Sequence, residues 1–334
     1  MDKYVVVGGG ISGILACQVL HRNRLDFIAL EKDGDLGGRL RFGHHRIYSQ
    51  ASVEFLSSHV ATDWIEVFDL PRVRIKGGWT EEIPRVSSAE QFYLRGNYFH
   101  PSSSFEPMLG ELAQRLGDHL ICRKSVSQIN REGNELVCQD GVSIPFEKLI
   151  WCADLKQLLS ILQHKFGANR ILNEVPALHG GISLELTVPS IEEISHGTFL
   201  FPFVFKSWDL NCIITPTKSP KPNLYCLLFL ECDLLQNREE VAKCVRTLKR
   251  ALFREFPFLE KLIQNERLAY LPNLSGEQSV KSDSLEIFPS IFYVGPQLYC
   301  EDSQEGLRNL DLTLSNLSLF SKSLGTSYAP ILET

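Results

Sequence analysis

The sequence lacks the cysteine patterns that mark disulfide frameworks and metal sites. Nine of its 334 residues are cysteine, and no two of them form a CxxC pair. The number is odd, and several lie in apolar runs such as Leu149–Ala153 and Tyr225–Glu231. We interpret them as reduced, buried thiols and therefore expect a cytoplasmic protein. The only adjacent histidines, His44 and His45, match no standard ligand spacing, so no metal site is expected.

Long apolar runs are also missing. The longest stretches, Phe199–Phe205 and Tyr225–Leu230, are far shorter than the roughly 18 residues that span a bilayer. The apolar run Tyr4–Val7 near the N-terminus is followed directly by glycines, which is not the pattern of a targeting peptide. We therefore expect no transmembrane segment.

The chain has no excess of positive charge. Lys and Arg number 34 against 40 Asp and Glu, which gives a formal net charge of -6. This is the wrong sign for a surface that neutralises phosphates, so nucleic acid is not an expected partner. A hydrolase is not expected either, because no GxSxG nucleophile motif occurs.

What remains is ordinary globular chemistry. The sequence is 44% hydrophobic and 22% charged, without the compositional signature of disorder. At about 100–200 residues per domain, the chain has room for about two domains. We expect it to fold around two hydrophobic cores.

The N-terminus holds a strand, a glycine turn and a helix. The β-branched run Tyr4–Val7 precedes Gly8-Gly9-Gly10-Ile11-Ser12-Gly13, and an apolar-periodic stretch follows from Ile14 to Leu20. A second apolar run, Phe27–Leu30, ends in Glu31. The pattern predicts a βαβ unit with GxGxxG at its first turn.

Each glycine of this turn has a physical role. Gly8 permits the tight turn, Gly10 lets a pyrophosphate approach the backbone, and Gly13 lets the helix pack on the strand. The helix N-terminus, with Ile11 and Ser12, offers N–H groups and partial positive charge to the diphosphate. Glu31 is placed to accept hydrogen bonds from ribose hydroxyls. The motif predicts binding of a dinucleotide without a 2′-phosphate.

The segment after Glu31 carries a resemblance to a known family. Gly37, Gly38 and Arg39 follow the acid, as in the fingerprint GxGxxG, then E, then GGR. This resembles the FAD-dependent amine oxidase and protoporphyrinogen oxidase superfamily, and the match covers about the first forty residues. Total length and order of elements are similar to its compact, renalase-like members.

The resemblance implies an α/β fold with a glutathione-reductase-like FAD-binding Rossmann domain and an interleaved α+β substrate domain. We expect the FAD domain at residues 1–50, 105–155 and 285–334, and the substrate domain at 51–104 and 156–284. FAD is the expected cofactor. The residues expected to bind it are Gly8, Gly10, Ile11, Ser12, Gly13, Glu31, Lys32, Gly37, Gly38, Arg39, Val126, Gly295, Gly306 and Leu307.

The implied reaction is a two-electron oxidation of a small molecule, with hydride transfer to flavin N5. Two alternatives stay open: a flavin-dependent desaturase or isomerase of the same fold, and a non-catalytic member with weakened FAD binding. The last is suggested by Pro296, where the family has an acid after the glycine of the late strand, and by a charged final helix. The sequence indicates neither catalytic residues nor the oligomeric state.

Several side chains have two open interpretations. Glu54 is either a pocket carboxylate or a surface acid on a short helix. The aromatic residues Tyr225, Phe229, Tyr293 and Tyr299 either wall a substrate cavity or belong to the core. The patterns also predict helices over His59–Asp69, Phe105–Leu116, Glu239–Glu255 and Glu305–Leu324, and a strand over Gln91–Phe99.

Overall fold

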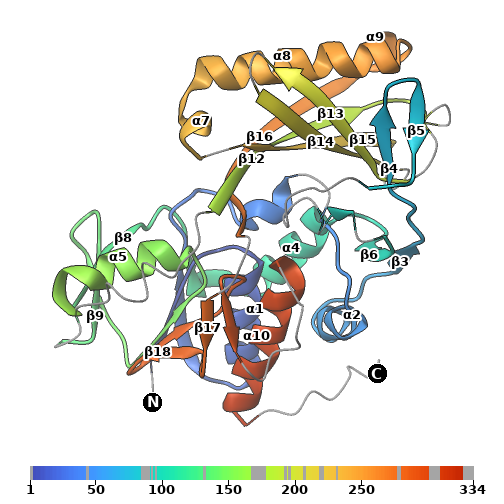
Figure 1. Ribbon diagram of the computed structural model, residues 1–334. Helices are drawn as coiled ribbons and strands as arrows, with labels where there is room; N and C mark the ends of the chain where they lie inside the picture. Colours follow the sequence, from blue (N-terminus) through green and yellow to red (C-terminus); the bar gives the residue numbers. More distant parts are fainter. Residues whose placement is uncertain are drawn as a thin grey trace.

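The structure is a computed structural model, and its elements form two units, one above the other in Figure 1. It describes residues 3–42, 45–83, 91, 93–94, 96–130, 133–166, 178–191, 194, 197–205, 208–217, 222–230, 232–276, 280–300 and 309–325. Of the eight cysteines whose side chains the structure describes, six are buried and none forms a disulfide. No helix in these ranges is long and apolar enough to cross a membrane.

The first unit is built on a six-stranded sheet in the order β18-β19-β11-β1-β2-β7. Its pairs are parallel except for β18 with β19. The central strand β1 is apolar throughout its buried part, as expected of a parallel strand covered on both faces. The strands are β1 (Lys3–Val7), β2 (Asp26–Leu30), β7 (Leu120–Ile121), β11 (Lys148–Trp151), β18 (Glu286–Phe288) and β19 (Ile291–Tyr293).

Helices and a small antiparallel sheet cover the six-stranded sheet. Helix α1 (Ile11–Arg22) contacts α4 (Phe105–Gln114) and α10 (Asn309–Ser323), which confirms the predicted βαβ start and the helices near residues 105 and 309. Helix α5 (Leu155–Phe166) contacts the three-stranded sheet. That sheet consists of β8 (Val126–Asn130), β9 (Glu135–Cys138) and β10 (Ser143–Pro145).

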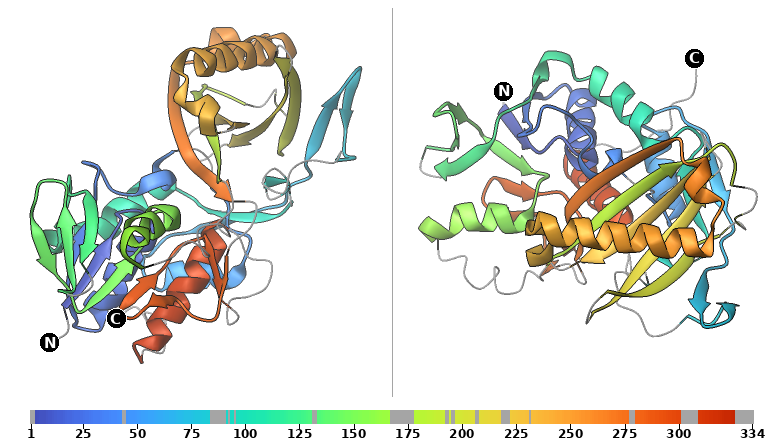
Figure 2. Two further views of the ribbon diagram at one scale, coloured as in Figure 1. Left: turned by 60° about the vertical axis from the view of Figure 1, so that its left-hand side comes forward. Right: turned by 90° about the horizontal axis from the view of Figure 1, so that it is seen from above.

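The second unit is a seven-stranded sheet in the order β16-β12-β15-β14-β13-β4-β5. Helix α8 (Arg238–Glu255) lies on the side of this sheet turned away from the first unit, as Figure 2 shows. The strands are β4 (Arg72–Ile75), β5 (Gly78–Thr80), β12 (Leu178–Thr187), β13 (Phe199–Phe205), β14 (Trp208–Thr217), β15 (Asn223–Leu230) and β16 (Asn265–Gly276). The mixed α/β architecture agrees with the expected fold class.

The remaining elements are short. A 3₁₀ turn, η1 (Gly38–Arg41), follows the second glycine pair, and η2 (Gly117–His119) precedes β7. The strand pairs are β3 (Trp64–Val67) with β6 (Tyr98–Pro101) and β17 (Val280–Ser282) with β20 (Leu298–Cys300). The other helices are α2 (Gln50–Ser57), α7 (Cys232–Gln236) and α9 (Leu259–Leu262).

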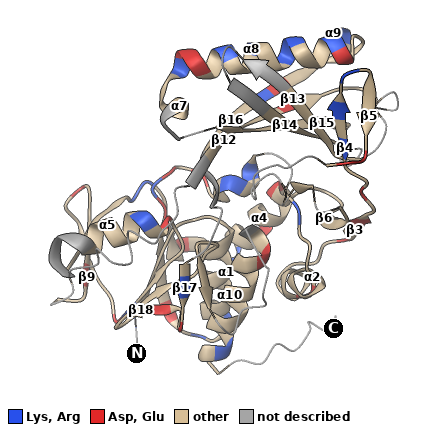
Figure 3. Cartoon of the chain, viewed as in Figure 1, with Lys and Arg blue, Asp and Glu red and all other residues tan. Residues whose placement is uncertain are grey.

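Helix α8 forms where the sequence predicted it, and its N-cap, its acidic first turn and its apolar stripe explain why. The Asn237 side chain caps its N-terminus by accepting hydrogen bonds from the backbone N–H groups of Glu239 and Glu240, at 3.1 and 3.3 Å. These two acids also stand at the positive end of the helix dipole. Its apolar stripe, which includes Val241 and Leu248, is buried against the sheet, and charged residues follow its exposed side (Figure 3).

The opposite face of the seven-stranded sheet is called the inner face below. Alternation along β15 separates the two faces, because Leu224, Cys226 and Leu228 pack under α8 while the odd-numbered residues point the other way. The inner face is turned toward the first unit, as Figures 1 and 2 show, and Arg267 on this face lies 4.8 Å from the centre of the Phe42 ring. Its residues include Ser183, Glu185, Ile213, Thr215, Thr217, Asn223, Tyr225, Leu227, Phe229, Arg267 and Ala269.

Two sequence predictions between the units were wrong. The predicted helix over His59–Asp69 is in fact the strand β3, and the helix α2 precedes it. β-branched and aromatic residues favour strand in this stretch, and antiparallel pairing with β6 decides it. The predicted strand over Gln91–Phe99 begins only at Tyr98.

The boundaries of the two units follow the cores. Leu155, Leu158 and Leu162 of α5 belong to the same buried cluster as β1 and α1, and so do Phe55 and Leu56 of α2. The second cluster joins the seven-stranded sheet to α8. We therefore propose that the first unit includes α2 and α5, beyond the limits at residues 50 and 155 that the sequence suggested.

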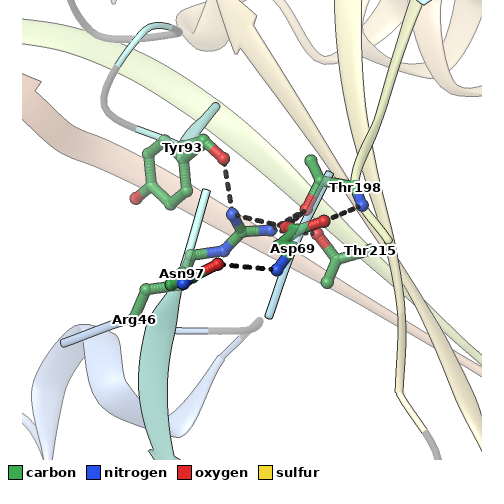
Figure 4. A network of polar contacts seen from close by, with 6 residues as sticks. All are labelled: Arg46, Asp69, Tyr93, Asn97, Thr198 and Thr215. Carbon is green, nitrogen blue, oxygen red and sulfur yellow. Dashed lines mark hydrogen bonds and ion pairs between the residues drawn. The ribbon is translucent and has the colours of Figure 1, made fainter. Parts of the chain in front are cut away.

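A buried ion pair joins the two units (Figure 4). Arg46 Nη1 lies 3.5 Å from Asp69 Oδ2, and the two side chains are 0% and 1% exposed. Arg46 also donates to Thr215 Oγ1 at 2.8 Å and to the hydroxyl of Thr198, while the Thr198 backbone N–H donates to Asp69 Oδ1 at 2.8 Å. The guanidinium stacks over the Tyr98 ring at 4.3 Å. The inner face is thus fixed to the segment after Arg39.

Replacing Asp69 with Ala leaves the Arg46 charge buried without its partner. We expect the free energy of unfolding to fall by about 3–5 kcal/mol, the usual cost of breaking a buried pair. Urea unfolding measures it. Asp63→Ala, which removes an exposed carboxylate from the same segment, is the control and changes stability by less than about 0.5 kcal/mol. Equal stability of the two variants would contradict this account of the junction.

Candidate functional site

The glycine turn between β1 and α1 is as tight as the motif requires. A Cβ placed on Gly13 would lie 1.7 Å from the carbonyl oxygen of Gly8, a distance that no side chain tolerates. Gly8 itself has a φ of +112°, and its N–H donates to the Leu30 carbonyl at 2.8 Å. Helix α1 therefore starts directly on the carboxyl edge of the parallel sheet, where ligands of such folds bind.

Gly10 differs from its neighbours because it faces open space. A Cβ on Gly10 would meet no atom within 4 Å. Gly10 is the N-cap of α1, and the first turn has neither a side-chain cap nor an acidic residue. Backbone N–H groups at this helix start, which includes Ile11 and Ser12, are therefore suited to an external acceptor such as a phosphate.

Glu31 lies at the end of β2, next to this turn, and is 8% exposed. Its carboxylate accepts hydrogen bonds from the Gly9 N–H and, at 2.8 Å, from the Asp33 N–H. Each carboxylate oxygen keeps a further lone-pair direction, so ribose hydroxyls can still donate to it. The Lys124 N–H donates to the Glu31 carbonyl at 2.8 Å, which brings the start of β8 and Val126 to the same edge.

The second glycine pair lies directly on the first turn. The Gly37 N–H donates to the Gly9 carbonyl at 2.7 Å, and Gly37 has a φ of +97°. A Cβ on Gly38 would lie 3.3 Å from the Gly10 Cα. These contacts join two segments that are distant in sequence. Arg39 follows Gly38, Lys32 follows Glu31, and both side chains are exposed.

Gly295 follows β19 at the same edge of the sheet, and the packing around it requires a glycine. A Cβ there would lie 2.5 Å from the Tyr293 hydroxyl oxygen. Its carbonyl accepts a hydrogen bond from the buried Asn316 Nδ2 of α10 at 2.8 Å. Pro296 and this loop are therefore held against α10. The expected site residues Gly306 and Leu307 lie outside the described residues.

The acidic residue near the start of the final helix is buried and hydrogen-bonded. Asp311 of α10 is 1% exposed, and its carboxylate accepts from the backbone N–H groups of Tyr48 and Ser49 at 2.9 and 3.0 Å. An acid that the sequence presented as a departure from the family pattern thus fixes the chain just after Arg46. Arg46 and Asp311 together hold this segment beneath the inner face. No sequence pattern marked Arg46, and the sequence marked Asp311 only as a departure from the family pattern.

A row of polar side chains crosses the inner face. Register places Glu185 opposite both Arg267 and Tyr225, and Tyr225 opposite Thr215. The Arg267 guanidinium lies 4.8 Å from the centre of the Phe42 ring, which follows η1. Thr215 at the other end of this polar row binds Arg46. The two ends of the polar row therefore lie at Phe42 and at Arg46.

The structure also places the other side chains that the sequence singled out. Glu54 is exposed on α2, as the surface interpretation predicted. Tyr293 is fully buried in the first core, and burial raises its pKa. Tyr225 and Phe229 lie on the inner face, partly buried. His45 Nε2 contacts the carbonyl oxygens of Arg39 and Phe42 at 2.9 and 2.8 Å.

Comparisons with known proteins agree with this geometry. A family model described as an NAD(P)-binding Rossmann-like domain matches residues 6–63, which include the glycine turn, Glu31 and the second glycine pair. No curated protein matches the chain in sequence. The family match thus covers the βαβ start, and structural similarity extends over the rest.

Several solved structures are similar along the whole chain. A triple mutant of putrescine oxidase with redesigned cofactor binding has a TM-score of 0.64 at 11% identity, covering 97% of this chain and 98% of that chain. The 2,6-dihydroxypyridine-3-hydroxylase of Arthrobacter nicotinovorans has a TM-score of 0.63 at 14% identity, covering 97% and 84%. Reduced UDP-galactopyranose mutase has a TM-score of 0.62 at 10% identity, covering 99% and 97%.

These similarities define the class of fold. The chain begins with an NAD(P)-binding Rossmann-like domain and shares its overall fold with these oxidase, hydroxylase and mutase structures. At such low identities the similarity concerns the fold alone. An oxidase, a hydroxylase and a mutase share it, so the fold does not select a reaction.

Gly10 provides the sharpest test of the site, because its side of the turn is open. We expect Gly10→Val to leave the free energy of unfolding within about 1 kcal/mol of the wild type. The added methyl groups occupy the space proposed for the diphosphate, so FAD affinity falls at least about tenfold, which corresponds to about 1.4 kcal/mol. Titration of the apoprotein with FAD, followed by quenching of flavin fluorescence, measures this.

The control is Gly110→Val on α4, where an added Cβ also meets no atom within 4 Å. It should bind FAD as the wild type does. A folded Gly10→Val variant with unchanged FAD affinity would contradict the assignment of this turn.

Proposed function

We propose that the protein is an FAD-dependent oxidoreductase that oxidises a small molecule in an amine-oxidase-like reaction. The observation that carries the proposal is the junction of the two glycine segments at the uncapped start of α1, with Glu31 beside them and open space at Gly10. The residues present there fit an adenosine diphosphate. The inner face of the seven-stranded sheet supports the proposal further. This face contacts Phe42 and Arg46, which follow the second glycine pair in the sequence.

The roles proposed for the chain's own residues follow from these positions. The start of α1 and Gly10 hold the diphosphate, Glu31 accepts from the ribose, and Gly37 and Gly38 close over the same site. Val126 is proposed to contact the adenine, and Gly295 to contact the cofactor from the end of β19. When bound, FAD supplies a hydride acceptor at flavin N5. The inner face would position the substrate and exclude water around it.

A desaturase or isomerase remains the alternative reaction. UDP-galactopyranose mutase shares the fold over nearly the whole chain. Anaerobic mixing with candidate substrates separates the two. An oxidase accumulates reduced flavin in proportion to the substrate consumed, whereas an isomerase forms product without a net change in flavin.

The purified protein is expected to show two flavin absorbance bands between about 300 and 550 nm, and denaturation should release FAD. The same spectrum tests the third hypothesis, a non-catalytic protein of this fold. A colourless protein that does not take up added FAD would overturn the proposed function and favour that hypothesis.

Glu31 tests the ribose contact. We expect Glu31→Ala to weaken FAD binding by about ten- to a hundredfold, because hydrogen bonds to a charged acceptor contribute about 1.5–3 kcal/mol. Equilibrium dialysis of the apoprotein with FAD measures the affinity. Asp26→Ala, at the exposed start of the same strand, serves as the control and should leave the affinity unchanged. Wild-type affinity in Glu31→Ala would refute this role.

A further inference from the structure

Helix α8 lies on the outer side of the seven-stranded sheet, opposite the inner face (Figures 1 and 2). Its apolar stripe is buried against the sheet, so the other side of the helix is turned to solvent. This exposed side belongs to a segment whose charge differs from that of the whole chain. Residues 238–262 contain seven basic and four acidic side chains, whereas the chain has a formal net charge of -6.

Three exposed arginines form a row along this side of α8. Arg246, Arg250 and Arg254 are spaced four residues apart, and all three are exposed. Side chains four positions apart lie on the same face of a helix, with about 6 Å of axial rise between them. The helix therefore presents three guanidinium groups over about 12 Å of its length. We call these three residues the arginine row.

Carboxylates on and beside α8 are bound to cations outside the arginine row. Glu255, which follows Arg254 in the sequence, lies 2.8 Å from Arg74 Nε. Lys249 Nζ lies 2.5 Å from the Glu266 carboxylate. Among the residues that the structure describes, no carboxylate lies within 4.0 Å of a guanidinium group of the arginine row. The positive charge of the row is thus left without a partner in this part of the chain.

The arginine row does not contribute to the stability of the fold. Like charges four residues apart on a helix repel each other and destabilise it, and the row contains two such pairs. None of the three side chains makes a hydrogen bond, ion pair or ring contact to another described residue. An external anion is what offsets the repulsion, because it lies close to several of these charges at once.

A narrow anionic partner fits the row better than a broad anionic surface does. Exposed Glu239 at the start of α8 and exposed Glu260 in α9 lie toward the two ends of the row. A flat anionic surface would meet these carboxylates together with the arginines, and the net charge of -6 opposes its approach. A single polypeptide segment can follow the row alone. Its carboxylates can accept paired N–H bonds from the guanidinium groups.

We propose that the arginine row is a docking surface for an acidic segment of a partner protein, with carboxylates spaced to meet Arg246, Arg250 and Arg254. The contacts are exposed ion pairs, each of them weak and screened by salt. Because α8 covers the side of the sheet opposite the inner face, docking leaves the proposed cofactor site open. The inference is therefore independent of the proposed function.

The test is titration of fluorescein-labelled poly-L-glutamate with the purified full-length protein, followed by fluorescence anisotropy at neutral pH. The wild type should bind in about 50 mM NaCl and lose at least about tenfold in affinity in about 300 mM NaCl, because salt screens exposed charges. At the lower salt, a triple variant of the row should bind at least about tenfold more weakly than the wild type, because three ion pairs are lost. This variant combines Arg246→Gln, Arg250→Gln and Arg254→Gln.

The matched control removes the same net charge from exposed positions outside α8 and should bind poly-L-glutamate as the wild type does. It combines Arg24→Gln, Lys76→Gln and Lys156→Gln. An equal loss of affinity in the two triple variants would overturn the proposal, because the effect would then follow from net charge alone. A wild type that does not bind poly-L-glutamate at the lower salt would overturn it as well.

Two further measurements separate docking from other roles of the arginine row. The wild type should not sediment with vesicles of phosphatidylcholine and phosphatidylserine, and sedimentation would overturn the proposal in favour of a lipid surface. Thermal unfolding compares the row variant with the wild type. The variant should unfold at the same or a higher temperature, because two repulsive pairs are removed. A lower midpoint would assign the arginines to the fold and overturn the proposal.

Discussion

The approach of Gly13 to the carbonyl of Gly8 is the constraint on which the rest of the site depends. Only glycine permits it, because a Cβ at position 13 would lie 1.7 Å from that oxygen. The contact sets the start of α1 at the edge of the parallel sheet, with Gly10 facing open space. Glu31 and Gly37 then bond to the same turn through Gly9. Three stretches of the first forty residues thus converge on one place where a diphosphate fits.

A second constraint, the buried Arg46–Asp69 pair, positions the inner face relative to the first unit. Arg46 and Asp69 are buried as a pair between the units, and the hydroxyls of Thr198, just before β13, and of Thr215 in β14 complete their hydrogen bonds. Desolvated charges of this kind contribute little net stability, but they tolerate no other arrangement of their partners. The pair therefore determines which part of the inner face lies above the segment after Arg39. Asp311 holds Tyr48 and Ser49 of that segment from the other side.

Local sequence signals predicted the first unit well, because its start is encoded within forty residues. Strand, glycine turn, helix and acid are contiguous, and the structure places them as the pattern requires. Helix α8 was equally readable from its apolar stripe. Strands β14 and β16 were missed, and each contains a proline that argues against a strand. Pro216 lies where β14 no longer pairs with β13, and Pro272 of β16 lies where the register with β12 shifts.

The residues that join distant segments had no signal in the sequence. Arg46 and Thr215 are 169 positions apart, and Tyr48 and Asp311 are 263 apart. Such pairs become visible only when the sheet order is known. The same holds for Glu185, because its position opposite Tyr225 and Arg267 is set by the register of three strands. Sequence resemblance thus indicated a cofactor, whereas the inner face and its polar row became visible only from the fold.

The most direct measurement of the central claim is a crystal structure of the chain with FAD bound. The account predicts the diphosphate at the start of α1 beside Gly10, the ribose hydroxyls on Glu31, and the isoalloxazine ring beneath the polar row of the inner face. A diphosphate bound anywhere else on the first unit, or a flavin ring that points away from Glu185 and Tyr225, would contradict it.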